Sequence, residues 1–449
     1  MSERPWHRPL AVSNAPTDCL DILMMRKKGG AVLKRFAPRR LARLLALMMA
    51  LTPLATDAYL PAIPDIARYL GTEASAAANS MSLYLLGFAC GQVIFGPISD
   101  RIGRRPVAIG GIIVFFLSSL ALAFSSSLMM FCSLRFVEAL GGGACSVNAA
   151  AVVRDRFSGR ESARMMSTMT MILLLAPLGA PSLGALLNNY AGGWQAIFLF
   201  LAIYALVALT LVSRKLPETA VLSGHAEGLA TIARRYGRVL GHRAALGYII
   251  AVACSYAGIF SFLSASSYLC INYYKVPEWI YGLMFTGNII LVLGANRLNL
   301  SLLKHHSPHD ILKVGMMLQL GFGVMALLTV ALRLDAAWTL MPLVIIFSSM
   351  NGLITANAIS SMLDYFPSMS ATATAALGCI QFSSGGIGSF IVNAFGDYGP
   401  WPLVIMLTSV GVISNVMFRL LSEAHARTTS REGLAEKPHA ELEDSSLRT

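Results

Sequence analysis

Apolar runs of about 20 residues recur along nearly the whole of this 449-residue chain, and they constrain its fold more than any other feature. Each run is long enough to cross the ~30 Å hydrocarbon core of a bilayer as an α-helix. The runs at 107–124 and 196–212 are apolar on every face, whereas strands of a membrane barrel alternate apolar and polar residues over ~10 positions. Composition agrees, because 55% of the residues are hydrophobic, 13% are charged and the mean hydropathy is +0.63. The sequence therefore predicts an all-α membrane protein.

The apolar runs delimit about twelve transmembrane helices in two six-helix bundles. We expect the spans near 41–63, 80–98, 107–126, 129–152, 165–187, 194–213, 244–270, 279–296, 312–332, 337–360, 371–395 and 401–421. A longer polar connection joins the two halves of this set. The predicted organisation begins with a basic tail (1–40), an N-terminal bundle (41–213) and a linker (214–243). A C-terminal bundle (244–421) and a second polar tail (422–449) follow.

Lys and Arg residues collect in alternate loops, and this asymmetry predicts the orientation of the chain. They lie before the first span, within 101–105 and 154–164, and in the linker, whereas the opposite loops hold little more than Arg68, Lys275 and Arg333. We therefore expect both termini in the cytoplasm and the protein in the inner membrane. The net charge of +12 is then a consequence of topology, so we expect no nucleic-acid partner.

Residues 1–40 lack an apolar stretch of the right length ahead of a small-residue cleavage site, so we do not expect a cleavable signal peptide. They fit either a disordered basic tail or a true translation start at Met24 or Met25. Residues 422–449 fit a second cytoplasmic tail.

Motifs for enzymes, metals and nucleotides are missing from the sequence. The seven cysteines are scattered without CxxC spacing, which favours free thiols. The string HHSPHD at 305–310 has the residue types of a metal site, but no cysteine or acid cluster fixes a geometry, so we expect a solvated loop. No GxxxxGK[ST], GxSxG or HExxH occurs. We therefore expect no enzyme, no cofactor and no metal, and work driven by an ion gradient or by the solute's own gradient.

Few ionisable residues fall inside the spans, where each costs about 2.5–3.5 kcal/mol unless it faces a cavity or a partner. Asp57 interrupts the apolar run of the first span, either as a functional group or as an outer-edge carboxylate near the helix end at Pro61 and Pro64. Arg135 and Glu138 in the fourth span are three residues apart and so share a helix face. They form either a static ion pair or, together with Asp57, a proton relay.

The string GPISDRIGRRP at 96–106 is the most informative short motif. We expect Gly96 and Pro97 to end a span. Asp100 offers a helix-capping carboxylate, and Gly103 permits a tight turn. The cytoplasmic side is then anchored by Arg101, Arg104 and Arg105.

This loop resembles the signature loop between the second and third spans of the major facilitator superfamily. The resemblance implies a transporter of two helical bundles with a central cavity and alternating access to the two sides of the membrane. In that family the acid and the arginines of the loop latch the cytoplasmic gate, a role that would fall to Asp100, Arg101 and Arg104.

Further motifs narrow the resemblance. LTPLATDAYLPAIP resembles the first-span signature of the twelve-span drug:proton antiporters, with Asp57 at the acidic position, and Arg135 matches the arginine of their fourth-span motif. APLGAPSLGA at 176–185 resembles their fifth-span antiporter motif, in which Pro181 and Gly184 are retained, while Pro177 and Pro181 leave carbonyls free for bending. With SYAGIFSFLSASSYL and LDYFPSMSATATAALG, the pattern is most similar to the bicyclomycin- and chloramphenicol-resistance branch, often called Bcr/CflA.

Three positions depart from the patterns of these relatives. Glu138 and Ala139 stand where the fourth-span motif has Gln and Gly, which puts an extra acid beside Arg135. Met49 stands where one chloramphenicol-exporting relative has a second first-span acid, so Asp57 is alone in its span.

The resemblance implies proton-coupled efflux of small, mostly apolar or cationic drugs by alternating access. Burial disfavours a charged carboxylate and a nearby cation favours it, so Asp57 could exchange a proton for a drug while Arg135 and Glu138 tune the exchange.

An exporter or importer of an endogenous metabolite is the alternative on the same fold; a membrane enzyme or receptor would need a catalytic or ligand-binding constellation. We expect small molecules, protons and the bilayer as partners of a monomer. The expected walls of the substrate cavity are Tyr59, Tyr84, Asn148, Tyr256, Phe260, Phe262, Asn351 and Gln381.

Overall fold

The structure is a computed structural model that describes residues 38–157, 161, 165–166, 168–169, 172–173, 175–220, 229–366 and 369–423. These residues form helices and contain no strand. Within them, eleven helices are long and apolar enough to cross a membrane. The all-α membrane fold predicted from the apolar runs is therefore confirmed. The two tails lie almost wholly outside the described residues.

The N-terminal half begins with a broken first span. This span is divided into α2 (Pro38–Met49), α3 (Leu51–Asp57), the short η1 (Leu60–Ala62) and α4 (Ile63–Tyr69). The expected fifth span at 165–187 falls partly on residues that are not described, and its described part is the helix α9. The remaining helices of this half are α5 (Ala74–Ile102), α6 (Arg104–Leu122), α7 (Leu128–Arg156), α9 (Leu175–Tyr190) and α10 (Trp194–Lys215).

The expected linker holds a helix of its own, α11 (Leu229–Gly241), before the C-terminal half begins. The C-terminal half starts with α12 (Arg243–Ser267), which continues into η2 (Tyr268–Tyr273). Its tenth span consists of α15 and α16, which are separated only by Met350. The other elements are α13 (Glu278–Leu302), α14 (Pro308–Ala331), α15 (Ala337–Ser349), α16 (Asn351–Leu363), α17 (Ser370–Ala394), η3 (Gly396–Tyr398), α18 (Trp401–Phe418) and η4 (Arg419–Glu423).

The second span does not end at Gly96 and Pro97 as predicted, because α5 runs on to Ile102 with Pro97 inside it. A proline in a helix removes one backbone donor, but neighbouring contacts can hold the following turn. Here the Ser99 hydroxyl donates to Asn148 of α7, and the carbonyl of Ser99 accepts from the N–H of Gly103 at 3.1 Å. The helix therefore continues past the proline until Gly103.

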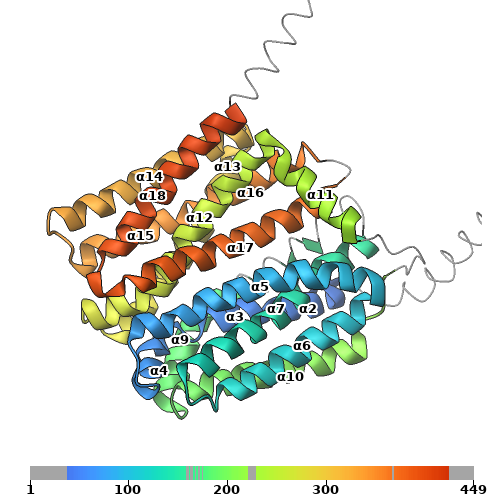
Figure 1. The fold of residues 1–449 in the computed structure, drawn as a ribbon, viewed down its shortest axis with the longest axis horizontal. Helices are drawn as coiled ribbons and strands as arrows, with labels where there is room; N and C mark the ends of the chain where they lie inside the picture. Colours follow the sequence, from blue (N-terminus) through green and yellow to red (C-terminus); the bar gives the residue numbers. More distant parts are fainter. Residues whose placement is uncertain are drawn as a thin grey trace, which may run out of the picture.

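The helices form two groups that meet along α5 and α17 (Figure 1). These two helices run antiparallel, because residues further along α5 contact residues earlier in α17. Ser82 donates to Ser389 at 2.9 Å, and further along α5 the ring of Phe88 lies 4.6 Å from that of Phe382. A Cβ on Gly386 would lie 2.8 Å from the backbone oxygen of Ser82, so glycine is required for this close approach.

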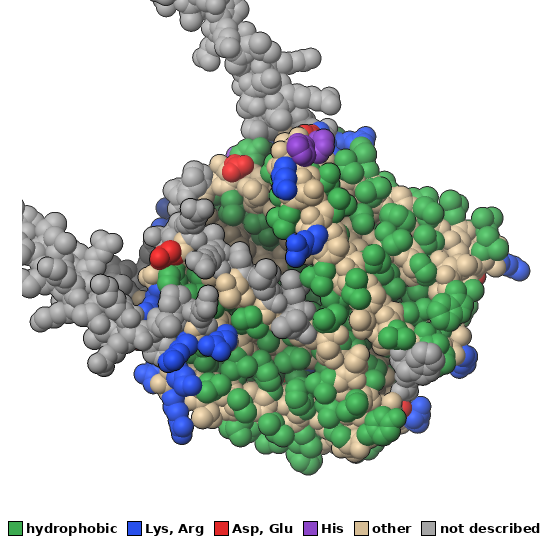
Figure 2. Space-filling view, turned by 180° about the vertical axis from the view of Figure 1, so that it is seen from behind, with side chains coloured by type: hydrophobic (Ala, Val, Ile, Leu, Met, Phe, Trp, Pro, Cys, Tyr) green, Lys and Arg blue, Asp and Glu red, His purple; other side chains and the backbone are tan. Residues whose placement is uncertain are grey.

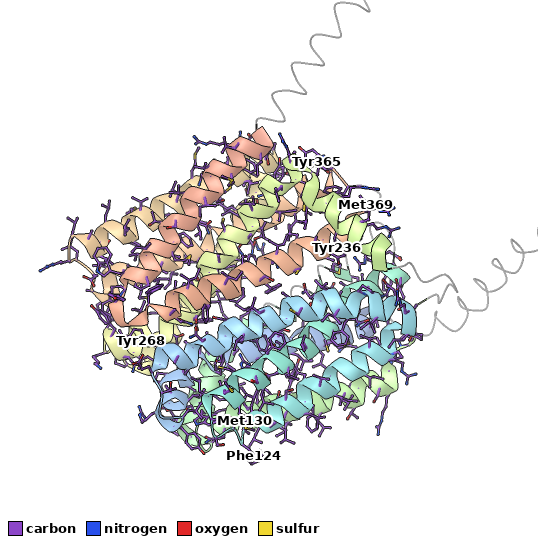
Figure 3. The ribbon with its side chains drawn as sticks, viewed as in Figure 1. Phe124, Met130, Tyr236, Tyr268, Tyr365 and Met369 are labelled. Atoms are coloured by element: carbon purple, nitrogen blue, oxygen red, sulfur yellow. The ribbon has the colours of Figure 1, made fainter. Side chains whose placement is uncertain are left out.

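Charged loops gather at one end of the molecule, which we call the basic end. It carries Arg101 in the last turn of α5, Arg104 and Arg105 in the first turn of α6, and the last turns of α7 and α10. The linker helix α11 lies at this end, packed against α12 and α17 (Figure 1). Tyr236 of α11 lies there with Met369, whereas Tyr268 lies at the opposite end (Figure 3).

The outer surface is largely apolar. Large hydrophobic side chains of several spans are exposed, including Leu117 (55%), Ile203 (62%) and Leu300 (63%). In Figure 2 apolar side chains are spread over the described face, and the largest group of Lys and Arg lies at its left edge. Exposed apolar patches of this extent suit contact with lipid rather than with water.

Candidate functional site

Asp57 lies at the break in the first span and is buried. It is the last residue of α3, its side chain is 7% exposed, and its Oδ1 accepts a hydrogen bond from the Thr56 hydroxyl at 2.9 Å. None of the ion pairs among the described residues involves Asp57. The structure thus buries this carboxylate inside the protein, without an ion-pair partner among the described residues.

The antiporter motif of α9 contacts the chain beside Asp57. A Cβ on Gly184 would collide with the backbone oxygen of Ala58, the residue that follows Asp57. Glycine at this position therefore allows α9 to approach the end of α3. Pro181 lies within the same helix and is buried, and Pro177 is half-buried one turn earlier.

Arg135 and Glu138 form an ion pair that is fully buried. Nη1 of Arg135 lies 2.7 Å from Oε2 of Glu138, and both side chains are 0% exposed. The other carboxylate oxygen of Glu138 accepts from the hydroxyl of Ser119 on α6 at 2.6 Å. A buried pair of opposite charges with added hydrogen bonds is far less costly than either charge alone. The two residues that the sequence placed on one helix face are therefore partners.

Aromatic rings surround the guanidinium of Arg135. Its Cζ lies 4.3 Å from the ring centres of both Tyr59 and Tyr84, a distance at which cations are attracted to ring faces. Nη2 donates to the backbone oxygen of Ala55 at 3.0 Å. Because Ala55 is two residues before Asp57 in α3, the buried pair is connected to Asp57 through the backbone and not by a direct ion pair.

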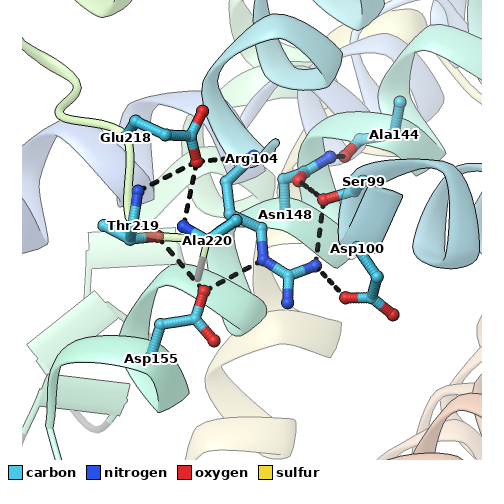
Figure 4. A network of polar contacts seen from close by, with 9 residues as sticks. All are labelled: Ser99, Asp100, Arg104, Ala144, Asn148, Asp155, Glu218, Thr219 and Ala220. Atoms are coloured by element: carbon cyan, nitrogen blue, oxygen red, sulfur yellow. Dashed lines mark hydrogen bonds and ion pairs between the residues drawn. The ribbon is translucent and has the colours of Figure 1, made fainter. Parts of the chain in front are cut away.

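The basic end contains a polar network centred on Arg104 (Figure 4). Arg104 pairs with Asp100 one turn earlier at 2.5 Å and with Asp155 at the end of α7 at 2.9 Å. It also donates to the Ser99 hydroxyl at 3.0 Å, and Ser99 in turn bonds Asn148. Arg101, which was predicted to share this role, lies exposed in the last turn of α5.

Glu218, and not Asp100, accepts the free amides at the start of α6. Its carboxylate accepts from the backbone N–H of Arg104 at 2.8 Å and of Arg105 at 3.1 Å. The same carboxylate accepts from its own neighbours Thr219 and Ala220, each at 2.9 Å. Burial favours a raised pKa for Glu218, but these four N–H donors prevail and lower the pKa below its usual 4.5.

Gly103 makes this arrangement possible. Its φ of 109° favours glycine, and a Cβ there would lie 2.5 Å from Oε2 of Glu218. A Cβ on Gly96, by contrast, would meet only the side chain of Val147, in ordinary contact at 3.8 Å. The glycine that shapes the loop is thus the one at the turn.

The seam between the two halves is lined by an aromatic cluster that includes two of the expected cavity residues. Phe382 of α17 lies 5.7 Å from Tyr256 and 6.1 Å from Phe260 of α12, between ring centres, and it also meets Phe88 of α5. Beside this cluster, the side-chain oxygen of Gln381 is buried and has no hydrogen-bond partner among the described residues. An unpaired buried acceptor suits contact with a small polar group of a ligand.

The other expected cavity residues are distributed over several parts of the molecule. Tyr59 and Tyr84 enclose Arg135, and Asn148 belongs to the network at the basic end. Asn351 accepts from Ser255 at 3.3 Å and contacts Tyr256 of the aromatic cluster, and Phe262 is buried. Phe88 and Phe382 were not predicted, because an aromatic residue in an apolar span gives no signal of its partner. Among the described residues, no three His, Cys, Asp or Glu side chains gather as metal ligands.

The fold and the sequence both define the class of protein. The model of the Major Facilitator Superfamily matches residues 45–389, so the chain belongs to that family of transporters. Its fold also resembles the solved D-xylose-proton symporter, with a TM-score of 0.65 at 15% identity over 83% of this chain and 95% of that one.

Curated relatives identify the branch within the family. The chain is 31% identical over 386 residues to a bicyclomycin resistance protein homolog of Haemophilus influenzae, which covers 86% of this chain and 96% of the relative. It is 31% identical over 375 residues to a chloramphenicol resistance protein of Pseudomonas aeruginosa, covering 81% and 86%. The resemblance to the bicyclomycin- and chloramphenicol-resistance branch is therefore confirmed.

Proposed function

We propose that this protein exports small, mostly apolar or cationic drugs across the inner membrane in exchange for protons. The relatives named for resistance to bicyclomycin and chloramphenicol support this substrate class, and both compounds are the first probes to test. The basic end would face the cytoplasm, because positively charged loops are retained on that side. Both termini would then be cytoplasmic as well.

The observation that carries the proposal is the contrast between the buried carboxylates. Glu138 is neutralised by Arg135 at 2.7 Å, whereas Asp57 is buried without an ion-pair partner among the described residues. An intramembrane charge without a partner is costly, and neutralising it by protonation removes that cost. We therefore assign proton binding to Asp57 and the holding of Arg135 to Glu138.

Coupling would follow from competition at Asp57. A cationic or polar drug near α3 favours the charged carboxylate, so that it releases its proton, and loss of the drug favours protonation again. Rocking of the two halves about the α5–α17 seam would expose Asp57 to each side in turn. The hydroxyl of Ser264 donates to the backbone oxygen of Ala78 at 3.3 Å, which joins the two halves away from the basic end.

Transport in inverted membrane vesicles tests this assignment. With Asp57→Asn, drug uptake driven by a proton gradient should fall to background, while exchange of labelled for unlabelled drug should persist because binding and rocking remain. Asp65→Asn is the matched control, since Asp65 lies outside the break and pairs with Arg68 at 2.9 Å. Glu138→Gln should leave the pH dependence of transport unaltered. Proton-driven uptake that survives in Asp57→Asn would refute Asp57 as the proton carrier.

A further inference from the structure

A groove lies between α2 and α10 at the basic end, and its lining residues take no part in the polar network around Arg104 or in the contacts of Asp57. It encloses a cavity of about 470 Å³, a size in the range of about 300–1,000 Å³ typical of small-molecule sites. Its walls combine positive charge with apolar side chains. The lining residues are Arg40, Arg43, Leu44, Leu47, Leu211 and Lys215.

On α2, the lining residues follow one helix face from charged to apolar. Positions 40, 43, 44 and 47 have the i, i+3, i+4, i+7 spacing that places them on one side of a helix. Arg40 and Arg43 are exposed at the beginning of the helix, and Leu47 lies deeper toward the membrane. The hydroxyl of Tyr204 on α10 donates to the backbone oxygen of Leu47 at 3.0 Å, which holds the two helices together below the cations.

On α10, a matching stripe continues the groove along the outer surface. Positions 203, 207, 211 and 215 are each four residues apart and therefore share one face. Val207 is 49% and Ile203 is 62% exposed, so the stripe is open to the surroundings of the protein. From Lys215 to Ile203 it extends about 18 Å at 1.5 Å per residue, close to the ~15 Å depth of one leaflet.

We propose that this groove binds one anionic phospholipid of the leaflet that meets the basic end. Its phosphate would contact Arg40, Arg43 and Lys215, and one acyl chain would follow Leu211, Val207 and Ile203. Basic pockets between transmembrane helices recognise anionic headgroups in this way. The three cations are complementary in charge to the phosphate. The apolar stripe favours a lipid over a free anion, because it can contact an acyl chain.

The chain's own tails are the competing occupants. The segment 1–37 carries more Lys and Arg than Asp and Glu, so it lacks charge complementarity to three cations. The end of the other tail, ELEDSSLRT at 441–449, is acidic and could reach for the same cations. It offers no long apolar stretch for the stripe on α10.

Lipid binding to the full-length protein in detergent tests the proposal. Native mass spectrometry would compare phosphatidylglycerol with phosphatidylcholine, and thermal unfolding would compare phosphatidylglycerol with inorganic phosphate. The triple variant R40Q/R43Q/K215Q should bind phosphatidylglycerol about a hundredfold more weakly, since each surface cation contributes roughly fivefold. K215Q alone, at the exposed end of α10, should bind phosphatidylglycerol about fivefold more weakly. This single variant tests the proposal even if the triple variant folds poorly.

A matched triple variant elsewhere at the basic end separates a site from diffuse charge. R234Q/R238Q/R243Q removes the same charge from exposed positions on and beside α11, and phosphatidylglycerol binding should change less than about twofold. An equal loss in both triple variants would overturn the proposal. So would equal binding of phosphatidylcholine, or thermal stabilisation by inorganic phosphate as large as that by the lipid. A tenfold gain in lipid affinity after removal of 424–449 would assign the groove to the tail instead.

Discussion

The two halves of the molecule bury different kinds of polar group. The N-terminal half buries charge, in Asp57, Arg135 and Glu138. Among the described residues of the C-terminal half, the buried polar side chains are Ser, Asn and Gln, without a charged one. Burying a charge is much more costly than burying an amide or hydroxyl, so its retention needs a partner or a function. The difference supports our proposal that the energy coupling resides in the N-terminal half.

Several amides of the C-terminal half instead bond one another, hydroxyl groups and the backbone. Asn357 donates to Asn299 and to the backbone oxygen of Leu353, both at 2.7 Å, which joins α16 to α13. Gln319 of α14 donates to Ser255 of α12 at 3.0 Å. These bonds are satisfied within the half and fix how its helices pack. If the comparison between halves is correct, removing such a bond should affect stability and leave proton coupling intact.

Breaking the buried ion pair should have the largest effect. Arg135→Gln leaves the carboxylate of Glu138 buried without its cation, and we expect a loss of about 3–5 kcal/mol in the free energy of unfolding. The double variant R135Q/E138Q removes both charges and should regain most of that loss. Denaturant titration of the purified protein in detergent measures both. A double variant no more stable than Arg135→Gln would mean that the pair does not neutralise itself, and it would weaken the assignment of Asp57 as the proton carrier.

Breaking an amide pair in the other half should have a smaller effect. Asn357→Leu leaves the side-chain oxygen of Asn299 without its donor, at a cost of about 1–3 kcal/mol. The pH dependence of drug transport should not change. Ala356→Leu, one position away and exposed, is the matched control and should stay within about 0.5 kcal/mol of the parent. A shifted pH profile in Asn357→Leu would show that coupling extends into the C-terminal half.

The sequence predicts features that depend on local composition. The length of the apolar runs identifies the membrane spans. The carboxylate inside the first span identifies Asp57 as a candidate functional residue, because ionisable side chains are rare in membrane spans. The spacing of Arg135 and Glu138 correctly places them on one face. Each of these signals is carried by residues close together in the chain.

Contacts between distant segments could not be predicted. Pro97 was expected to end a helix, yet Ser99 and its partner Asn148, 49 residues away, hold the next turn. Glu218 contacts the start of α6 across 114 residues of sequence, and nothing in the string PET marks it as a helix cap. Whether Arg135 pairs with Glu138 or with Asp57 likewise depended on how α3 and α7 pack. Patterns in one sequence do not predict such contacts, because the contacts depend on how separate helices pack against each other.

The smallest predicted effect concerns the beginning of the linker, which the contacts of Glu218 assign to the N-terminal half. Glu218→Gln keeps the shape but removes the charge that four N–H donors stabilise, and we expect a loss of about 0.5–1 kcal/mol at pH 7. Because the folded-state pKa is lowered, this contribution is present above the usual value of 4.5 and is lost as pH falls through the folded-state value. The stability difference between parent and variant should therefore shrink as the pH falls below 4.5 and vanish once the pH lies below the folded-state pKa.

Glu73→Gln is the matched control for this measurement. Glu73 also stands exposed at a helix start, that of α5, but its side chain makes no capping hydrogen bond there. Its replacement should change stability by less than about 0.5 kcal/mol at either pH. Equal effects of the two substitutions would mean that Glu218 contributes only through the general preference for negative charge at a helix N-terminus. A difference confined to Glu218 would tie the linker to the α5–α6 turn, so that only its later part, α11, moves with the C-terminal half when the two halves rock.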